Sequence, residues 1–283
     1  VEKGYYKDEG LNVTLNPSAQ NLPEIQAVAG KTDTIGLAGG ASLFLARAQG
    51  LPVKAFGATF QKGPGCFLWK EGSGIKGIAD FRGKKIGHQQ TARASTEAML
   101  TINNLKVEEV TLVPVGFDVQ PLLTGQVDIL TGLVTNQVLS LEGAGEKIGY
   151  APYADLGFAF YWNTPFALEE TIASKRDLLV AWLRATARGW EYALRNVDEV
   201  AKFVVDKYGE GLKLDNQLLE LKRETPLIQT DFTKQKGLMW MDRAVWQSGH
   251  DILLNRTKQL EKPLPVDEVM TLDILEKVGK IGG

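Results

Sequence analysis

The chain has 283 residues, of which 44% are apolar and 23% are charged, and these are ordinary values for a globular protein. Its 32 lysines and arginines almost balance its 34 aspartates and glutamates, which gives a formal net charge of −2. This composition excludes a disordered chain, a collagen and a coiled-coil array. It also leaves no basic excess for a phosphate backbone, so we expect no nucleic-acid partner.

Cysteine content and hydropathy exclude further classes of protein. The single cysteine, Cys66, can form no disulfide within the chain, and no Cys/His spacing resembles a zinc site. No apolar run reaches the length of a membrane span. The chain starts at Val1 without a methionine, which suggests that a leader has been removed and allows a secreted origin.

Short β-rich runs alternate with helical patterns over the first 165 residues. Strands are expected at 12–16, 34–38, 53–58, 66–70, 85–88, 111–115, 127–130 and 158–162, and helices at 23–29, 42–49 and 91–105. This alternation predicts a mostly parallel α/β sheet with ligands at the carboxyl ends of its strands. A helix and turn at 3–10 come first, so the usual opening strand either lies outside this sequence or is irregular.

From Pro165 onward the pattern is almost purely helical. Ser174 and Asp177 predict a capping box before a long helix with a wide apolar stripe. Further helices are expected at 197–207, 216–224, 237–255 and 266–278. No internal repeat or Pro/Gly/Ser-rich linker interrupts the chain, so a domain boundary is expected where strands cross between domains.

Familiar catalytic motifs do not assemble. Gly72, Gly74 and Gly77 fit G-x-G-x-x-G, but Gly83 follows so closely that only one helical turn fits between them, which predicts a structural turn. Neither G-x-S-x-G, H-E-x-x-H nor a P-loop occurs. Of the two histidines, His88 ends an expected strand where a ligand could meet it, whereas His250 lies in an expected helix and is interpreted as solvated or packed.

Polar and aromatic residues gather where the expected strands end. A small-molecule cleft needs apolar walls with a few aimed polar groups, and these loops supply both. Aromatic rings at three positions offer stacking faces, and amide side chains at three others match ring donors and acceptors. The candidate ligand-binding residues are Gly40, Ser42, Phe60, Gln61, His88, Gln90, Thr91, Phe117, Asn136 and Trp162.

Several segments, in their order along the chain, resemble periplasmic substrate-binding proteins of ABC importers. The resemblance is to the branch that contains thiamine-pyrimidine, riboflavin, aliphatic sulfonate and nitrate binders. GQVD after an Asp-x-x-x-Leu-Leu helix start is characteristic of its thiamine-pyrimidine-like subgroup. The matching segments are EKGYYKDEGL (2–11), AQGLPV (48–53), GIKGIADFRGKKIG (74–87), GQVD (125–128), ATARGW (185–190) and PLPVD (263–267).

The resemblance implies an α/β, two-lobed periplasmic-binding-protein fold of type II that closes on its ligand about a hinge. Mapped here, the chain would cross between lobes near Lys84 and Phe158, so that one lobe combines 1–83 with 158–283 and the other is 84–157. The family begins with a strand and an aromatic-polar loop that this chain lacks. Part of the ligand pocket is therefore expected to lie outside the sequence.

The function implied is capture of a small solute, delivered to an ABC permease by a monomer in the periplasm or another extracytoplasmic space. A lipid anchor would belong to a segment not present here. The favoured ligand is a planar heteroaromatic, such as a thiamine-pyrimidine precursor or a flavin. No catalysis, cofactor or metal is expected.

Three alternatives stay open. A sulfonate or nitrate would bind instead at helix N-termini near Ser42 and Thr91, with Arg93. A thiamine-pyrimidine synthase shares the resemblance but implies an active-site histidine and a cysteine-rich iron-binding segment, and only Cys66 is present. A ligand-sensing domain of a signalling protein would share the fold and differ in its attached domains.

Overall fold

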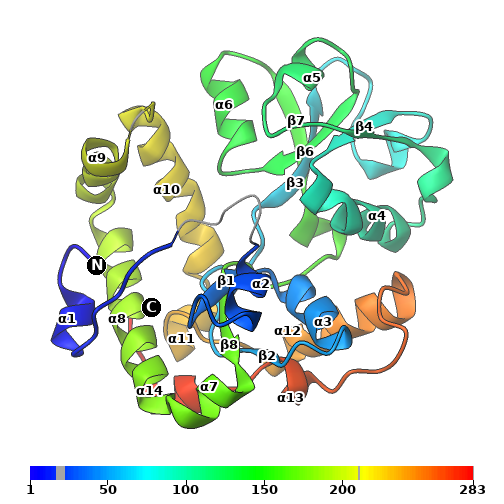
Figure 1. Ribbon diagram of the computed structural model, residues 1–283. Coiled ribbons are helices and arrows are strands. Elements are labelled where there is room, and N and C mark those ends of the chain that lie inside the picture. Colours follow the sequence, from blue (N-terminus) through cyan, green and yellow to red (C-terminus); the bar gives the residue numbers. More distant parts are fainter. Residues whose placement is uncertain (17–22, 210, 283) are drawn as a thin grey trace.

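The computed structural model describes residues 1–16, 23–209 and 211–282 and folds them around two β-sheets (Figure 1). The first sheet has three strands in the order β1-β8-β2, and the second has five in the order β5-β4-β6-β3-β7. The strands are β1 (Gly36–Ala38), β2 (Val53–Ala55), β3 (Gly65–Lys70), β4 (Lys85–His88), β5 (Thr111–Pro114), β6 (Ile129–Leu133), β7 (Ile148–Pro152) and β8 (Thr164–Leu168).

Helices cover both sheets. Those around the first sheet are α1 (Tyr5–Asp8), α2 (Glu24–Ala29), α3 (Gly40–Ala48), α7 (Glu169–Ser174), α8 (Arg176–Arg195), α9 (Val197–Tyr208), α10 (Leu214–Ile228), α11 (Asp231–Lys236), α12 (Arg243–Asp251), the π-helix η5 (Ile252–Arg256), α13 (Val266–Val269) and α14 (Asp273–Val278). Those around the second are α4 (Arg93–Ile102), α5 (Gln120–Leu123), α6 (Gln137–Gly143) and the 3-10 turns η1 (Ile78–Phe81), η2 (Gln90–Ala92), η3 (Val107–Glu109) and η4 (Tyr153–Leu156).

The two sheets and their helices form two lobes, and the chain passes between them twice. Because β3 pairs with β6 and β7, the first crossing lies at 56–64 and not near Lys84 as the sequence predicted. The second crossing lies at 157–163. The crossings pair with each other, since Phe60 and Trp162 exchange backbone hydrogen bonds of 3.1 and 3.2 Å. The second lobe is thus one continuous stretch that begins with β3.

The sheets are mixed, which corrects the prediction of a mostly parallel sheet. In the second sheet β4 runs parallel to β5 and β6, whereas β3 runs antiparallel to β6 and β7. In the first sheet β8 runs antiparallel to both neighbours, with Phe166 opposite Gly36 and Ala55. In each sheet one strand, β8 in the first and β3 in the second, runs opposite to both of its neighbours.

Alternation along β3 builds the core of the second lobe. Phe67 and Trp69 join a cluster on one face of the sheet, whereas Cys66 and Leu68 join a cluster on the other, as the period of two in a strand requires. Phe67 packs edge-on against Phe81 and Tyr153, with ring centres 5.1 and 5.0 Å apart. Both faces are therefore covered by apolar side chains.

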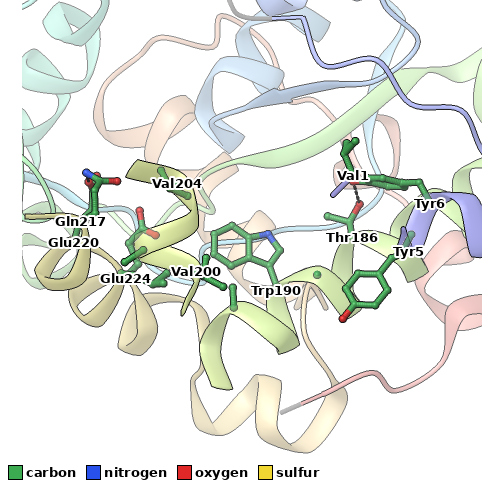
Figure 2. A pocket seen from close by; sticks show the side chains of 15 residues that line it. Val1, Tyr5, Tyr6, Thr186, Trp190, Val200, Val204, Gln217, Glu220 and Glu224 are labelled. Atoms are coloured by element: carbon green, nitrogen blue, oxygen red, sulfur yellow. Dashed lines mark hydrogen bonds between the residues drawn. The ribbon is translucent and has the colours of Figure 1, made fainter. Parts of the chain in front are cut away.

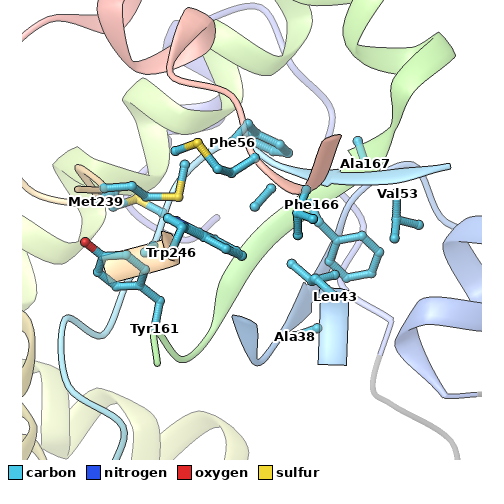
Figure 3. Packing of buried hydrophobic residues seen from close by; sticks show 14 of the residues in the cluster. Ala38, Leu43, Val53, Phe56, Tyr161, Phe166, Ala167, Met239 and Trp246 are labelled. Carbon is cyan, nitrogen blue, oxygen red and sulfur yellow. The ribbon is translucent and has the colours of Figure 1, made fainter. Parts of the chain in front are cut away.

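The core of the first lobe lies between its sheet and the surrounding helices (Figure 3). Phe166 and Val53 come from the sheet, and Leu43 packs on them from α3. Phe56, Met239 and Trp246 fill the space beside them, and all three are buried. The same cluster fixes the segment around Tyr161, whose hydroxyl accepts a hydrogen bond from the Asp242 amide at 2.7 Å.

Several expected elements are wrong in detail; for example, the helix expected at 237–255 begins only at Arg243, and the one expected at 266–278 is divided into α13 and α14. Residues 12–16 form no strand; they run along a groove of about 670 Å³ that separates them from β1, whose ladder pairs it only with β8 in the described part of the chain. Residues 158–162 form a crossing and not a strand. Ser174 caps nothing, because α7 ends there and its hydroxyl donates to the Glu170 carbonyl. The expected Gly72–Gly77 turn is confirmed.

Candidate functional site

The candidate site is a cleft of about 430 Å³ between the two lobes. Its first-lobe wall comes from the end of β1 and the start of α3, together with the crossing segments. Its second-lobe wall comes from the ends of β4 and β6 and from the loop after β5. Strand ends from both sheets therefore meet at one place, as expected for α/β ligand sites. Glycines let the backbone form much of the wall, at Gly39, Gly40, Gly63, Gly65 and Gly132.

Aromatic rings give the cleft its apolar character. Trp162, on the second crossing, is 41% exposed, and Phe117, on the second lobe, is 72% exposed, which is unusual for rings of this size. Tyr153, Phe158 and Phe160 line the cleft from deeper positions. An exposed ring on the crossing and another on the second lobe can take a planar ligand between them or beside them.

A few polar groups in the cleft are available to a ligand. Ser42 and Asn163 line it, and neither side chain makes a hydrogen bond to another described residue. The amides of Ala41 and Ser42 belong to the first turn of α3, where N–H groups have no partner inside the helix. The Gly40 amide already donates to the Tyr161 carbonyl at 3.0 Å. The cleft thus offers donors that suit ring carbonyls and ring nitrogens.

Other polar side chains in the cleft hold the wall together. Gln89 donates to the carbonyls of Gly116 and Thr131, and its own carbonyl accepts from the Thr131 hydroxyl at 2.9 Å. Gln137 accepts from the Leu133 amide and donates to the Phe117 carbonyl at 3.0 Å. These buried amides are satisfied internally, so their role is to fix the loops that carry Phe117 and the end of β6.

Charge is sparse at the cleft. Within the described part of the chain, Glu24 is the one lining residue that carries a charge, and no lysine, arginine or histidine lines the cleft. Burying an anion without a cation is costly, although the first turn of α3 offers partial compensation. The arrangement therefore suits an uncharged ligand better than a sulfonate.

The cleft gathers some of the residues that the sequence singled out. Gly40, Ser42, Phe117 and Trp162 line it. The remaining candidates lie elsewhere: Phe60 packs edge-on against Trp190 in the core, Gln61 donates to the carbonyls of Ala58 and Trp240, Gln90 is exposed in η2, and Asn136 is exposed before α6. Thr91 belongs to η2, but its side chain lies outside the described part. Phe60, Gln61, Gln90 and Asn136 stand at or near strand ends, yet none of the four is among the described residues that line the cleft.

Neither histidine reaches the cleft. His88 is fully buried at the end of β4, where its Nδ1 lies 3.0 Å from the Gln89 carbonyl. His250 is packed, as one interpretation expected: its Nδ1 lies 2.9 Å from Asp251, and its Nε2 accepts from the Leu264 amide. Burial raises the pKa of the Cys66 thiol, which keeps it protonated. No group of three metal-binding side chains occurs among the described residues.

Asn163 is the polar residue that sequence reasoning passed over as a ligand contact. It follows Trp162 directly, and its backbone has φ of 47°, in the left-handed region where asparagine is one of the few tolerated residues. This conformation turns the chain at a position that lines the cleft. The signal available in the sequence was an asparagine directly after a tryptophan and before a short apolar segment.

A second cavity, of about 440 Å³, lies away from the cleft among α1, α8, α9 and α10 (Figure 2). Trp190 projects into its middle, with Tyr6 and Thr186 toward one end and Glu220 and Glu224 toward the other. Burial, together with the nearby charge of Glu220, raises the pKa of Glu224 to about 7. The described residues that line this cavity all belong to the first lobe.

The chain belongs to the NMT1/THI5-like family, which it matches over residues 1–200. It is 28% identical over 279 residues to the riboflavin-binding protein RibY of Chloroflexus aurantiacus, covering 95% of this chain and 78% of that protein. It is 23% identical over 266 residues to a formylaminopyrimidine-binding protein of Halalkalibacterium halodurans, covering 89% and 80%. A more distant match is a 4-amino-5-hydroxymethyl-2-methylpyrimidine phosphate synthase of Schizosaccharomyces pombe, 26% identical over 65% of this chain and 57% of that enzyme.

Solved structures share the fold. A putative periplasmic sulfonate-binding protein of Methylobacillus flagellatus superposes with a TM-score of 0.68 at 15% identity, covering 97% of this chain and 84% of that one. The two-lobed α/β fold of periplasmic binding proteins, expected from the sequence, is thereby confirmed. Among the described residues, no helix combines the length and apolar character needed to cross a bilayer. Together these similarities point to a solute-binding role.

Proposed function

We propose that this protein captures an uncharged, planar heteroaromatic solute, a pyrimidine or a flavin, outside the cytoplasm and delivers it to an ABC permease as a monomer. The observation that carries the proposal is the interlobe cleft, whose described lining joins exposed aromatic rings to uncharged donors. The names of the riboflavin-binding and formylaminopyrimidine-binding relatives support the same ligand class.

Binding would combine stacking with a small number of hydrogen bonds. Trp162 supplies a ring face at the crossing, and Phe117 supplies one from the other lobe. The Asn163 carboxamide and the first amides of α3 would pair with ring carbonyls and nitrogens. Closure buries the ligand between the lobes, which shifts an equilibrium between open and closed forms.

The proposal assigns no chemical conversion to the cleft. Ser42 and Ser95 are the serines among the described lining residues, and no histidine lines the cleft beside them to activate a serine nucleophile. The protonated Cys66 thiol is buried in β3, away from the lining. The protein should therefore return its tightest ligand unchanged after prolonged incubation; an altered product would move it to the synthase class.

An oxyanion ligand is the second candidate, because the first turn of α3 opens into the cleft and can hold an anion. The two candidate ligands predict a different dependence of binding on salt concentration. An uncharged heteroaromatic needs no counterion and should bind with little dependence on salt, whereas a sulfonate held by a helix end should weaken as ionic strength rises.

The deciding experiment is a calorimetric titration with riboflavin, formylaminopyrimidine and an alkanesulfonate, each repeated with Trp162→Ala. We expect riboflavin or the pyrimidine to bind and the variant to lose about 1–3 kcal/mol of binding free energy. Phe203→Ala is the matched control, since Phe203 is similarly exposed but lies on α9. Binding of the sulfonate alone would overturn the proposal.

Placement and delivery have separate tests. Fractionation of cells that make the natural protein should find it outside the cytoplasm, and partition into the detergent phase would reveal a lipid anchor. Uptake of the labelled ligand into cells that carry the cognate permease should depend on this protein. Uptake that is equal with and without it would contradict the delivery role.

A further inference from the structure

Arg223 makes hydrogen bonds between the two lobes. It lies on α10, in the first lobe, and donates through one terminal nitrogen to the Val134 carbonyl at 3.1 Å. Through the other it donates to the Glu142 carboxylate on α6, in the second lobe, at 2.5 Å. Its guanidinium carbon also lies 6.0 Å from the centre of the Tyr150 ring. One side chain of the first lobe is therefore fixed by three groups of the other.

The surroundings of the Arg223–Glu142 ion pair favour a net stabilising contribution to the contact between the lobes. The Arg223 side chain is only 30% exposed and that of Glu142 only 39%, so solvent screens the ion pair less than it screens a fully exposed pair. The planar guanidinium satisfies a carbonyl and a carboxylate at once, a geometry that lysine cannot reproduce. Neither side chain lines the cleft, so neither would touch a ligand there.

A second contact joins the lobes on the other side of the crossings. Arg256 lies in η5 of the first lobe and donates to the Ile102 carbonyl at 2.9 Å. Ile102 is the last residue of α4, and a cation there also complements the negative end of the helix. In Figure 1, α6 faces α10 on one side of the molecule, and α4 stands above the segment after α12 on the other.

We propose that Arg223 is a positioning residue that holds the cleft in its ligand-binding geometry, with Arg256 as a weaker counterpart across the cleft. The inference rests on the proposed solute-binding function. In the described part of the chain, the backbone passes between the lobes only at 56–64 and 157–163, so rotation that opens the cleft carries α6 away from α10 and breaks the Arg223 contacts. Apparent affinity depends on the population of the closed form, so Arg223 acts on affinity without contacting ligand.

The test compares Arg223→Ala, Arg223→Lys and Glu142→Ala with the wild type, using riboflavin and formylaminopyrimidine as probes. Arg223→Ala should weaken binding by about 5- to 20-fold, mainly through faster dissociation. Arg223→Lys should recover part of the loss, because it keeps the charge. In the double variant with Glu142→Ala the two losses should be less than additive, since both remove the same contact.

Arg82→Ala is the matched control. Arg82 makes a comparable ion pair with Glu109, at 3.0 Å, but both residues belong to the second lobe. The control should therefore leave affinity and dissociation unchanged. Small-angle scattering of the ligand-free proteins adds a measurement that a merely structural role would not change: Arg223→Ala should have the larger radius of gyration at an unaltered melting temperature.

Two failures can be told apart. If wild-type protein binds a probe but Arg223→Ala binds it equally well while folded, the positioning role is wrong and the solute-binding function stands. If neither probe binds the wild type, the proposed function fails, and scattering still tests the contact between the lobes. An unchanged radius of gyration in ligand-free Arg223→Ala would then refute the inference as well.

Discussion

At the scale of single residues, one residue that lines the cleft has an unusual backbone conformation. Asn163 holds φ at 47° between the exposed ring of Trp162 and the buried start of β8. Most side chains are strained there, whereas glycine is not. The position therefore allows the carboxamide to be removed without disturbing the turn that carries it.

We expect Asn163→Gly to lower ligand affinity by about 1–3 kcal/mol, the usual effect of losing a buried hydrogen bond. The fold should be retained, because glycine accepts the left-handed backbone. Calorimetry for binding and thermal unfolding for stability measure the two effects separately. Equal affinity in a folded variant would remove Asn163 from the binding site.

Glu224 should make stability depend on pH. Burial raises its pKa to about 7 from 4.5, so between these values the folded protein holds a proton that the unfolded chain releases. Stability from this group is present at low pH and is lost as pH rises through that window. Glu224→Gln should be more stable than the wild type at pH 8, by about 1–2 kcal/mol, with no such gain near pH 4.

Denaturant unfolding at a series of pH values measures this difference. Glu276→Gln, at an exposed position on α14, is the control and should follow the wild-type curve. A gain for Glu224→Gln that is the same at every pH would mean that packing, and not ionisation, is responsible.

At the scale of elements, the packing of the second sheet depends on the absence of a side chain at Gly149. A methyl group added at Gly149, on β7, would lie 2.5 Å from the Nε1 atom of Trp69 on β3. The buried tryptophan cannot move aside without disturbing the cluster around Phe81. Gly189, inside α8, has nothing within 4 Å of the same position.

We therefore expect Gly149→Ala to destabilise the protein by about 1–3 kcal/mol through overpacking. Gly189→Ala, as the matched control, should stabilise it by about 0.5–1 kcal/mol because alanine favours the helix. Urea unfolding of both variants gives the comparison. A neutral Gly149→Ala would show that β7 can shift away from β3.

The elements that the sequence predicted correctly are those with strong local patterns. The apolar runs of β3 and β4 and the periodic stripe of α8 were predicted from residues alone. Both β7 and β8 were missed, because glycine or proline interrupts their short segments and the strands depend on distant partners. The first crossing was misplaced for the same reason, since the pairing of β3 with β6 and β7 leaves no local trace.

The same limit applies to the site. Strand-end loops could be located, but which side chains face the cleft is decided by packing, as Phe60 on Trp190 illustrates. Trp162 and Phe117 were found because a large ring at or just after the end of an expected strand is a local signal. The buried amide contacts of Gln89 and Gln137 connect segments far apart in the chain, so they became visible only in the structure.

At the scale of the whole molecule, the two crossings determine how the lobes can move. Phe60 and Trp162 pair the crossing segments with each other, so rotation is confined to a short two-stranded hinge. Saturation with the identified ligand should reduce the radius of gyration in small-angle scattering, while distances within each lobe stay constant. A ligand that binds without any change in scattering would argue against closure by a hinge.

The strand order of the first sheet also bears on how the protein is made. In the first sheet, β8 lies between β1 and β2 and is synthesised only after the whole second lobe. The first sheet is therefore still incomplete when residues 65–157, which contain all five strands of the second sheet, have been made. The second lobe should therefore fold first as the chain leaves the ribosome, with β1 and β2 exposed until β8 arrives. In pulsed hydrogen exchange during refolding of the full chain, amides of β3 and β6 should gain protection before those of β1 and β2; the reverse order would mean that the early strands find another partner.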